Sequence, residues 1–215
     1  MEKIYFISGL GADKRIFQKL KFFSDFQLDY VEWLEIYPSE SLYDYTLRLS
    51  VQINDKVPVN LVGVSFGGMV AILLSKIIPT KRVIIISSLQ CYDDLSLIYK
   101  WAGAIKIHKI IPSFLLTKSN FLSFFLFGAK QFETVQLLRN VLKDTDPLFL
   151  KWAINQVLTR RDYHLPNHFY HIHGTADYIL PKVPKNAIRI KNGGHLMVFE
   201  NAQEISVILD GILKN

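Results

Sequence analysis

The stretch from residue 59 to residue 79, VNLVGVSFGGMVAILLSKIIP, constrains the fold of this chain more than any other. It is typical of a short buried strand, a G-x-S-x-G turn around Ser65, and an apolar helix that stops at Pro79. So sharp a turn strains the serine backbone, and the flanking glycines remove Cβ atoms that would clash. This context favours a nucleophile elbow, in which the serine hydroxyl lies above the positive end of a helix. A serine that merely caps the helix is the alternative.

Apolar segments separated by turn residues predict an α/β fold. The predicted strands are residues 3–7, 28–33, 59–62, 82–86, 167–173 and 187–190. The helices predicted between and after them are residues 13–23, 42–53, 68–78 and 202–213. Because strands this apolar are typical of a sheet covered on both faces, we predict a mostly parallel sheet in a three-layer α/β/α arrangement. The carboxyl ends of parallel strands share one edge, so residues 8–11, Ser65 and residues 87–88 should be neighbours.

Between residues 89 and 165 the alternation of strands and helices stops. The helices predicted in this segment are residues 94–109, 119–127, 130–142 and 147–159. The segment is rich in aromatic residues, and we interpret it as a helical cap inserted into a core made of residues 1–88 and 166–215. Helical spacing does not reveal which surface the aromatic side chains face. A helical layer that only buries core is therefore the alternative.

Composition excludes several classes of protein. The 215 residues suit one domain, and the lysines behind the net charge of +6 are scattered, so we expect no nucleic-acid binding. A single cysteine, Cys91, excludes an internal disulfide and a cysteine-based zinc site, and fits a cytoplasmic protein. The N-terminus lacks the features of a signal peptide. Lys118, Ser119 and Asn120 interrupt the most apolar region, residues 110–129, so we expect no integral membrane segment.

Two loops near the end of the chain supply partners for Ser65. A serine hydroxyl is a weak nucleophile until a base accepts its proton, and a histidine oriented by a third group is the usual base. The HGTAD sequence places Asp177 just after one predicted strand, and the GGH sequence places His195 just after the next. These three residues are therefore candidates for a catalytic triad.

Four segments, ISGLGAD, GVSFGG, HGTADYILP and NGGHLMVFE, resemble those of small α/β-hydrolase superfamily members that lack the first two strands of the full sheet. The resemblance covers residues 3–88 and 166–215, with the cap as the variable part. Ser8 stands where a histidine commonly precedes the first-loop glycine. Pro181 and Pro184 leave little room for the usual helix between the aspartate and the histidine, so we expect a loop there.

The resemblance implies a role for each candidate residue. Ser65 corresponds to the nucleophile, His195 to the general base and then acid, and Asp177 to the residue that orients His195. One oxyanion-hole donor corresponds to the backbone amide of Phe66, which follows the nucleophile. The other donor comes from the loop after the first strand, where Leu10 is the best candidate.

Two other motifs are compatible with different chemistry. Residues 9–11, Gly-Leu-Gly, could open a dinucleotide fingerprint, but that motif needs a third glycine at position 14, which is Lys14. His171 and His173 alternate on one strand face and could bind a metal. Without a carboxylate or cysteine ligand placed nearby, a structural role is favoured, in which His173 helps to hold the Asp177 loop. No metal or organic cofactor is implied.

These features predict a serine hydrolase that cleaves a carboxylic ester or a related acyl substrate through an acyl-enzyme. The aromatic cap favours a small-molecule substrate with a hydrophobic acyl or alcohol group. Alternatives with the same triad are a thioesterase, an acyltransferase or a lyase, since the fold does not decide the reaction. A non-catalytic protein that binds a small hydrophobic ligand is another alternative, and residues 121–127 could attach it weakly to a membrane surface. The motifs do not determine an oligomeric state.

Overall fold

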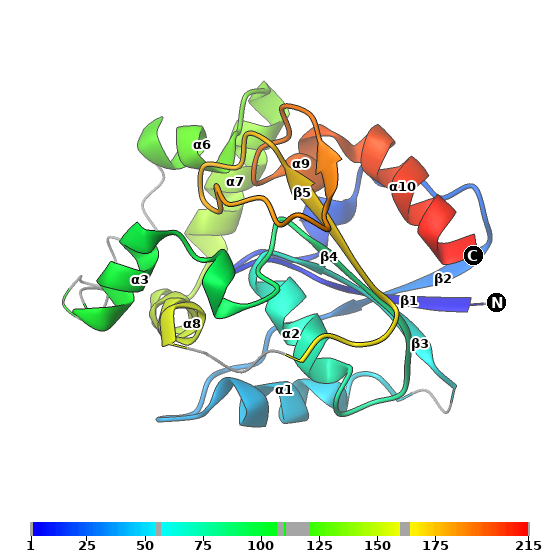
Figure 1. Ribbon diagram of the computed structural model, residues 1–215, viewed down its shortest axis with the longest axis horizontal. Helices are drawn as coiled ribbons and strands as arrows, with labels where there is room; N and C mark the ends of the chain where they lie inside the picture. Colours follow the sequence, from blue (N-terminus) through cyan, green and yellow to red (C-terminus); the bar gives the residue numbers. More distant parts are fainter. Residues whose placement is uncertain (1, 55–56, 107–109, 111–120, 160–163, 215) are drawn as a thin grey trace.

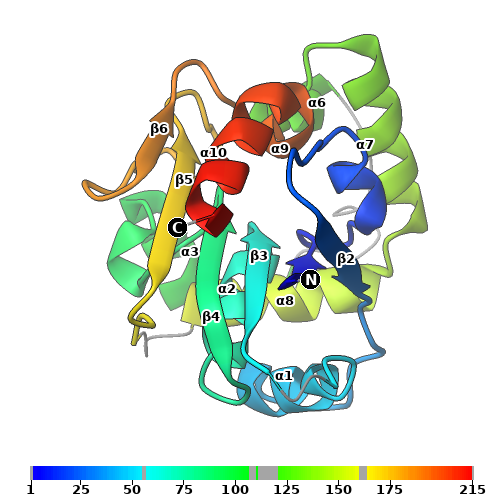
Figure 2. The ribbon, with the colours of Figure 1, turned by 90° about the vertical axis from the view of Figure 1, so that its right-hand side faces the viewer.

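A computed structural model of the chain describes residues 2–54, 57–106, 110, 121–159 and 164–214. Within these residues six strands form one sheet in the order β2-β1-β3-β4-β5-β6, and every neighbouring pair is parallel (Figure 1, Figure 2). The strands are β1 (Glu2–Ile7), β2 (Phe26–Val31), β3 (Val59–Val64), β4 (Thr80–Ile86), β5 (Phe169–Gly174) and β6 (Ile188–Ile190). The predicted parallel sheet is confirmed, with strand ends that differ from the predicted ones by a few residues.

Each face of the sheet is covered by its own set of helices. The first set is α1 (Leu42–Ser50) and α2 (Phe66–Leu74), and the second is the 3-10 turn η1 (Lys14–Phe17), α9 (Met197–Glu200) and α10 (Ala202–Lys214). Successive side chains of a strand point to opposite faces. Accordingly, Tyr5 and Ile7 of β1 pack with α1 and α2, whereas Ile4 and Phe6 pack with η1, α9 and α10. The predicted three-layer arrangement is therefore confirmed.

The helices between β4 and β5 lie beside the carboxyl ends of the strands, on the left and top of Figure 1. They are η2 (Tyr92–Asp94), α3 (Leu97–Ala104), α6 (Phe121–Phe127), α7 (Phe132–Asp144) and α8 (Pro147–Thr159). Three of them agree closely with the predicted helices. The helix predicted at residues 94–109 is represented by the shorter α3, and its last residues, 107–109, lie outside the described part of the chain.

The helix predicted at residues 13–23 is wrong beyond its first turn. Asp13 does cap a turn, accepting a hydrogen bond from the amide of Arg15, but regular structure ends at Phe17. The amide of Lys21 then donates to the hydroxyl of Ser206 in α10 at 2.9 Å. A tertiary hydrogen bond thus satisfies a donor that a continuing helix would have used.

Other differences are smaller. Helix α2 ends at Leu74 instead of continuing to Ile78, and the short helix α9 between the histidine loop and α10 was not predicted. Residues 175–187 form no helix, as the two prolines there indicated. The loop between Asp177 and His195 is therefore as expected.

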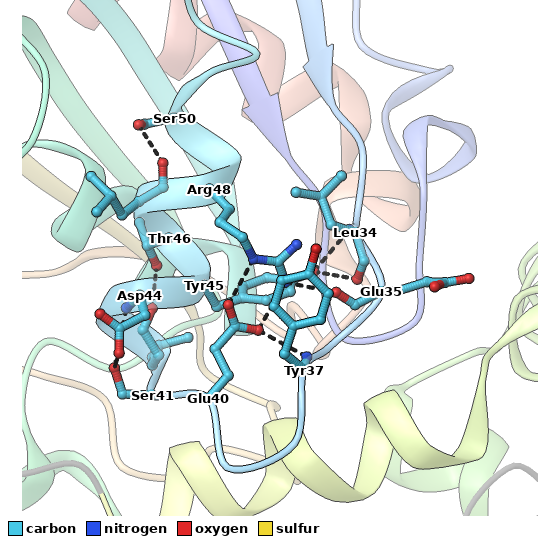
Figure 3. Close-up of polar contacts among 12 residues, drawn as sticks. Leu34, Glu35, Tyr37, Glu40, Ser41, Asp44, Tyr45, Thr46, Arg48 and Ser50 are labelled. Carbon is cyan, nitrogen blue, oxygen red and sulfur yellow. Dashed lines mark hydrogen bonds and ion pairs between the residues drawn. The ribbon is translucent and has the colours of Figure 1, made fainter.

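Arg48 of α1 forms hydrogen bonds that hold the loop between β2 and α1 (Figure 3). The Nε and Nη2 atoms of Arg48 donate to the carboxylate of Glu40 at 2.7 and 2.8 Å, and Nη2 also donates to the carbonyl of Glu35 at 2.7 Å. The guanidinium lies 3.9 Å from the ring centroid of Tyr37. Trp152 of α8 donates to the carbonyl of Glu40 at 2.9 Å. Side chains of both α1 and α8 therefore hold this loop in place.

Two features of the described residues bear on membrane and metal binding. None of the helices described is long and apolar enough to cross a bilayer. In the same part of the chain, no group of three or more His, Cys, Asp or Glu side chains could hold a metal ion. The membrane attachment considered for residues 121–127 depends partly on the side chains of residues 121 and 122, which lie outside the description.

Candidate active site

Ser65 lies in the turn between β3 and α2 in a backbone conformation that L-residues rarely adopt. Its φ is 53° and its ψ is −119°. A Cβ atom at Gly63 would lie 2.3 Å from the carbonyl oxygen of Gly67, and a Cβ at Gly67 would lie 2.2 Å from the carbonyl oxygen of Ser8. Both contacts are with backbone atoms and leave no room for a side chain. The G-x-S-x-G spacing is therefore a steric requirement of this turn.

The structure brings the three predicted side chains into one line of hydrogen bonds. The Oγ atom of Ser65 lies 3.0 Å from His195 Nε2, and His195 Nδ1 lies 2.8 Å from Asp177 Oδ2. A carboxylate only accepts hydrogen bonds, so Nδ1 of His195 carries the proton and Nε2 is free to accept one from the serine. Asp177 and His195 are almost completely buried. The residues come from the loops after β3, β5 and β6.

Asp177 is held in its ionised form by its surroundings. Its second oxygen, Oδ1, accepts from the backbone amides of Ile179 at 3.0 Å and Leu180 at 2.8 Å. Burial raises the pKa of Asp177, but the charge and hydrogen bond of His195 and the Leu180 amide outweigh it, so the pKa is lowered. An ionised carboxylate at this position stabilises an imidazolium on His195.

The two predicted oxyanion donors lie beside Ser65. Within the described residues, the backbone amides of Leu10 and Phe66 donate to no other group. Phe66 is the first residue of α2, where a helix leaves its amides unpaired. A Cβ built on Gly9 would lie 3.5 Å from the Cβ of Ser65, so the first loop packs directly against the serine. Leu10, Phe66 and Ser65 line the same cavity.

The first loop is anchored by side chains that the sequence did not single out for this role. The indole Nε1 of Trp33 donates to the carbonyls of Gly9 at 3.2 Å and Ala12 at 3.0 Å. The hydroxyl of Ser8 donates to the carbonyl of Ala12 at 2.6 Å. These bonds occupy the loop carbonyls and hold the loop that contains Leu10. No pattern in the sequence indicated Trp33, because its partners are backbone atoms of another segment.

A further contact joins this loop to the segment between β4 and β5. Thr145, at the end of α7, donates through its hydroxyl to the carbonyls of Val141 at 2.6 Å and Gly11 at 3.1 Å. Gly11 has a φ of 65°, and a Cβ there would lie 2.2 Å from Thr145 Oγ1. The segment between β4 and β5 therefore touches the loop that carries a predicted oxyanion donor.

Ser65 and His195 open into an apolar cavity of about 740 Å³. The segment between β4 and β5 forms much of its wall, including the side chains of Leu95, Phe127, Leu138, Val141, Ile154 and Val157. Three aromatic residues of this segment show two different kinds of contact. Phe149 and Trp152 pack against Tyr45 and other rings of the core, whereas Phe127 lines the cavity with its ring 5.5 Å from that of His195.

His171 and His173 lie together behind Asp177, and their ring nitrogens contact each other and neighbouring groups of the protein. His171 Nε2 lies 3.1 Å from His173 Nδ1, and His173 Nε2 lies 2.8 Å from the carbonyl oxygen of Leu180. The remaining nitrogen, His171 Nδ1, lies 2.8 Å from Gln90 Nε2. All four ring nitrogens therefore have partners within the protein.

Comparison with known proteins gives matches of structure only. No protein-family model and no curated protein matches the chain. Its structure is similar to a hydrolase from Oleispira antarctica, with a TM-score of 0.72 and 17% identity over 100% of this chain and 92% of that one. It is also similar to a thermophilic esterase from Thermogutta terrifontis, with a TM-score of 0.69 and 14% identity over 100% and 90%. A bromoperoxidase from Bacillus anthracis gives a TM-score of 0.69 and 17% identity over 100% and 92%.

These matches cover nearly the whole of each chain, although the sequence identities are low. The parallel six-stranded sheet with helices on both of its faces matches the fold of those structures. The chain has the α/β-hydrolase fold.

Proposed function

We propose that the protein is a serine hydrolase that cleaves a carboxylic ester or a related acyl substrate through an acyl-enzyme. The observation that carries this proposal is the unbroken line of hydrogen bonds from Ser65 through His195 to Asp177, at the wall of an apolar cavity. The hydrolase and the esterase among the structural neighbours support it.

In the first half of the reaction, Ser65 Oγ attacks the carbonyl carbon of the substrate while His195 Nε2 accepts its proton. The amides of Phe66 and Leu10 donate to the negatively charged oxygen of the tetrahedral intermediate, and each such donor is typically worth about 3 kcal/mol. His195 then gives the proton to the departing alcohol as the bond between carbon and alcohol oxygen breaks. The acyl group remains esterified to Ser65.

In the second half, water takes the place of the alcohol. His195 Nε2 accepts a proton from the water as its oxygen attacks the acyl carbon, and then returns the proton to Ser65 Oγ as the acid leaves. Asp177 accepts the hydrogen bond from Nδ1 throughout, so the other nitrogen always faces the reacting atoms. Its lowered pKa keeps it ionised in the neutral range, where it stabilises the imidazolium formed in each half.

The inserted segment defines the substrate class. We propose that residues 89–165 act as a cap on a core of residues 1–88 and 166–215, and that the cap binds the hydrocarbon part of the substrate. Apolar side chains on α6, α7 and α8 line the cavity beside Ser65. Burying one methylene group is worth about 0.8 kcal/mol. Each carbon added to the acyl chain should therefore raise kcat/KM by about fourfold until the cavity is full.

The test is hydrolysis of p-nitrophenyl esters with short, medium and long acyl chains. Ser65→Ala should lower turnover by about 10⁴-fold or more without unfolding the protein. Ser75→Ala is the matched control, because Ser75 closes the other end of α2 and its hydroxyl donates only to the carbonyl of Ile72. A folded wild-type protein that hydrolyses none of these esters, nor the corresponding acyl-CoA thioesters, would contradict the proposal. Faster hydrolysis of the thioesters would select a thioesterase.

A further inference from the structure

Three buried polar side chains and one exposed asparagine, from three segments, meet behind Asp177. Gln90 follows β4, His171 and His173 belong to β5, and Asn186 precedes β6. Gln90 is 8% exposed, His171 2% and His173 0%. Polar groups buried this deeply destabilise a fold unless every one of them is hydrogen-bonded. None of these four side chains takes part in the reaction proposed above.

Every hydrogen bond among them is donated in the direction that leads away from Gln90. Gln90 Nε2 has two protons, and donates one to Asn186 Oδ1 and the other to His171 Nδ1, both at 2.8 Å. His171 must then carry its own proton on Nε2, which donates to His173 Nδ1 at 3.1 Å. His173 carries its proton on Nε2 for the same reason and donates it to the carbonyl oxygen of Leu180 at 2.8 Å. Each ring accepts at Nδ1 and donates at Nε2.

The environment keeps both rings neutral, as this arrangement requires. The pKa of His171 is lowered to about 3, mainly because the ring is buried; His173 beside it also lowers the pKa, and Asp177 opposes the shift. Burial also lowers the pKa of His173, although its hydrogen bond to the Leu180 carbonyl opposes the shift. Neither ring therefore carries a charge at neutral pH, and each has a single proton to donate.

The chain of hydrogen bonds ends on a residue that touches Asp177. The carbonyl of Leu180 accepts from His173, and the amide of Leu180 donates to Asp177 Oδ1 at 2.8 Å. His173 and Asp177 therefore hold the same residue from opposite sides. The other carboxylate oxygen, Asp177 Oδ2, accepts from His195, so the position of Leu180 determines where the carboxylate meets the imidazole.

We propose that Gln90, His171 and His173 are positioning residues, which fix the Leu180 main chain and through it the Asp177 carboxylate that orients His195. This inference rests on the proposed function, because it gives Asp177 and His195 their catalytic roles. Gln90 sets the direction of the hydrogen bonds, because it is the only one of these three residues that donates two protons. The last donor, His173 Nε2, makes the contact that matters for the reaction.

The first experiment reads the protonated nitrogens directly in the wild-type protein by ¹⁵N-detected NMR of the histidine rings. His171 and His173 should carry their protons on Nε2, and His195 should carry its proton on Nδ1. A proton on Nδ1 of His173 would overturn the proposal, because Nε2 could then not donate to Leu180. This readout does not need enzyme activity, so it remains decisive even if the protein proves not to be a hydrolase.

The second experiment compares two substitutions of the last donor. His173→Gln places an amide N–H near the position of Nε2 and should keep kcat within about threefold of wild type. His173→Leu removes the donor, and should lower kcat by about 10- to 100-fold while changing KM little, because a displaced carboxylate misorients the base but leaves the cavity unchanged. His168→Leu, at an exposed histidine just before β5, is the matched control and should have no effect on kcat.

A folded His173→Leu protein with wild-type kcat would overturn the proposal. If His173→Leu does not fold, Gln90→Leu decides the question, because it frees His171 Nδ1 and removes the constraint on both ring protons. It should lower kcat by about threefold or more and mix the two protonation patterns in the NMR spectrum. Unchanged kcat together with unchanged ring protons in that variant would contradict the inference.

Discussion

The two ends of the candidate triad are held in different ways. The turn that presents Ser65 depends on glycines that have no side chain, since a Cβ at either Gly63 or Gly67 would overlap the backbone. The turn that presents Asp177 is shaped by donors, since backbone amides hold its carboxylate and His173 holds the carbonyl of Leu180. The difference teaches which changes each turn tolerates. The serine turn should fail when atoms are added, and the aspartate turn when a donor is lost or a proton is gained.

The largest effect is expected from Gly67→Ala. Its new Cβ would lie 2.2 Å from the carbonyl oxygen of Ser8 and 2.3 Å from that of Ile7, both backbone atoms of the first loop and β1. We expect a loss of about 4 kcal/mol or more in the free energy of unfolding, measured by urea denaturation.

The same substitution at Gly211 is the matched control. A Cβ there meets nothing within 4 Å, and Gly211 lies inside α10. Gly211→Ala should therefore stabilise the protein by about 0.5–1 kcal/mol, because alanine favours a helix more than glycine. Equal destabilisation by the two substitutions would show that steric overlap does not govern the serine turn.

The second prediction probes the aspartate turn through pH. The pKa of His171 is lowered from 6.5 to about 3, so between these values the unfolded chain binds a proton that the folded protein does not. Stability should therefore fall on acidification through this window, by about 1.4 kcal/mol per pH unit for this group alone. The lowered pKa of Asp177 acts in the same direction, but only below pH 3.8.

Urea denaturation at several pH values between 7 and 4 measures this slope. His171→Gln removes the titrating ring, and we expect a flatter dependence of stability on pH, even if the variant is less stable at neutral pH. A slope that is the same in the variant and the wild type would assign the acid sensitivity to other groups.

The smallest effect is expected from Trp33→Phe, which keeps the aromatic packing but removes the donor to the carbonyls of Gly9 and Ala12. The first loop retains the Ser8 hydrogen bond, so we expect a decrease in kcat of about fivefold, equivalent to about 1 kcal/mol. Trp101→Phe is the matched control, because Trp101 lies exposed on α3. Equal kcat in the two variants would exclude a role for Trp33 in holding the loop.

The sequence allowed the fold and the candidate triad to be predicted because their signals are local. Continuous apolar runs indicated the strands, and glycines at fixed spacing indicated the turn at Ser65. Asp177 and His195 each lie a few residues after a strand, β5 or β6. The helix beyond Phe17 was wrong because the amide of Lys21 bonds to Ser206, a residue far along the chain.

Most of the contacts that support the site could not be predicted for the same reason, although the sequence favoured a role for His173 in holding the Asp177 loop. Trp33 donates to the carbonyls of Gly9 and Ala12. Gln90, which follows β4, donates to His171 in the neighbouring strand β5. Nothing near Trp33 or Gln90 in the sequence marks either of them. Contacts of a side chain with groups distant in the sequence leave no pattern of spacing, so they become visible only in the folded structure.

The most direct test of the central claim is to locate the covalent intermediate. A fluorophosphonate probe reacts with an activated serine, and mass spectrometry of the digested protein identifies the modified residue. We expect one adduct on the peptide that contains Ser65 and none in Ser65→Ala or after the protein is unfolded. An adduct that persists in Ser65→Ala, or a folded wild-type protein that hydrolyses esters with no adduct at Ser65, would contradict the assignment of this serine as the nucleophile.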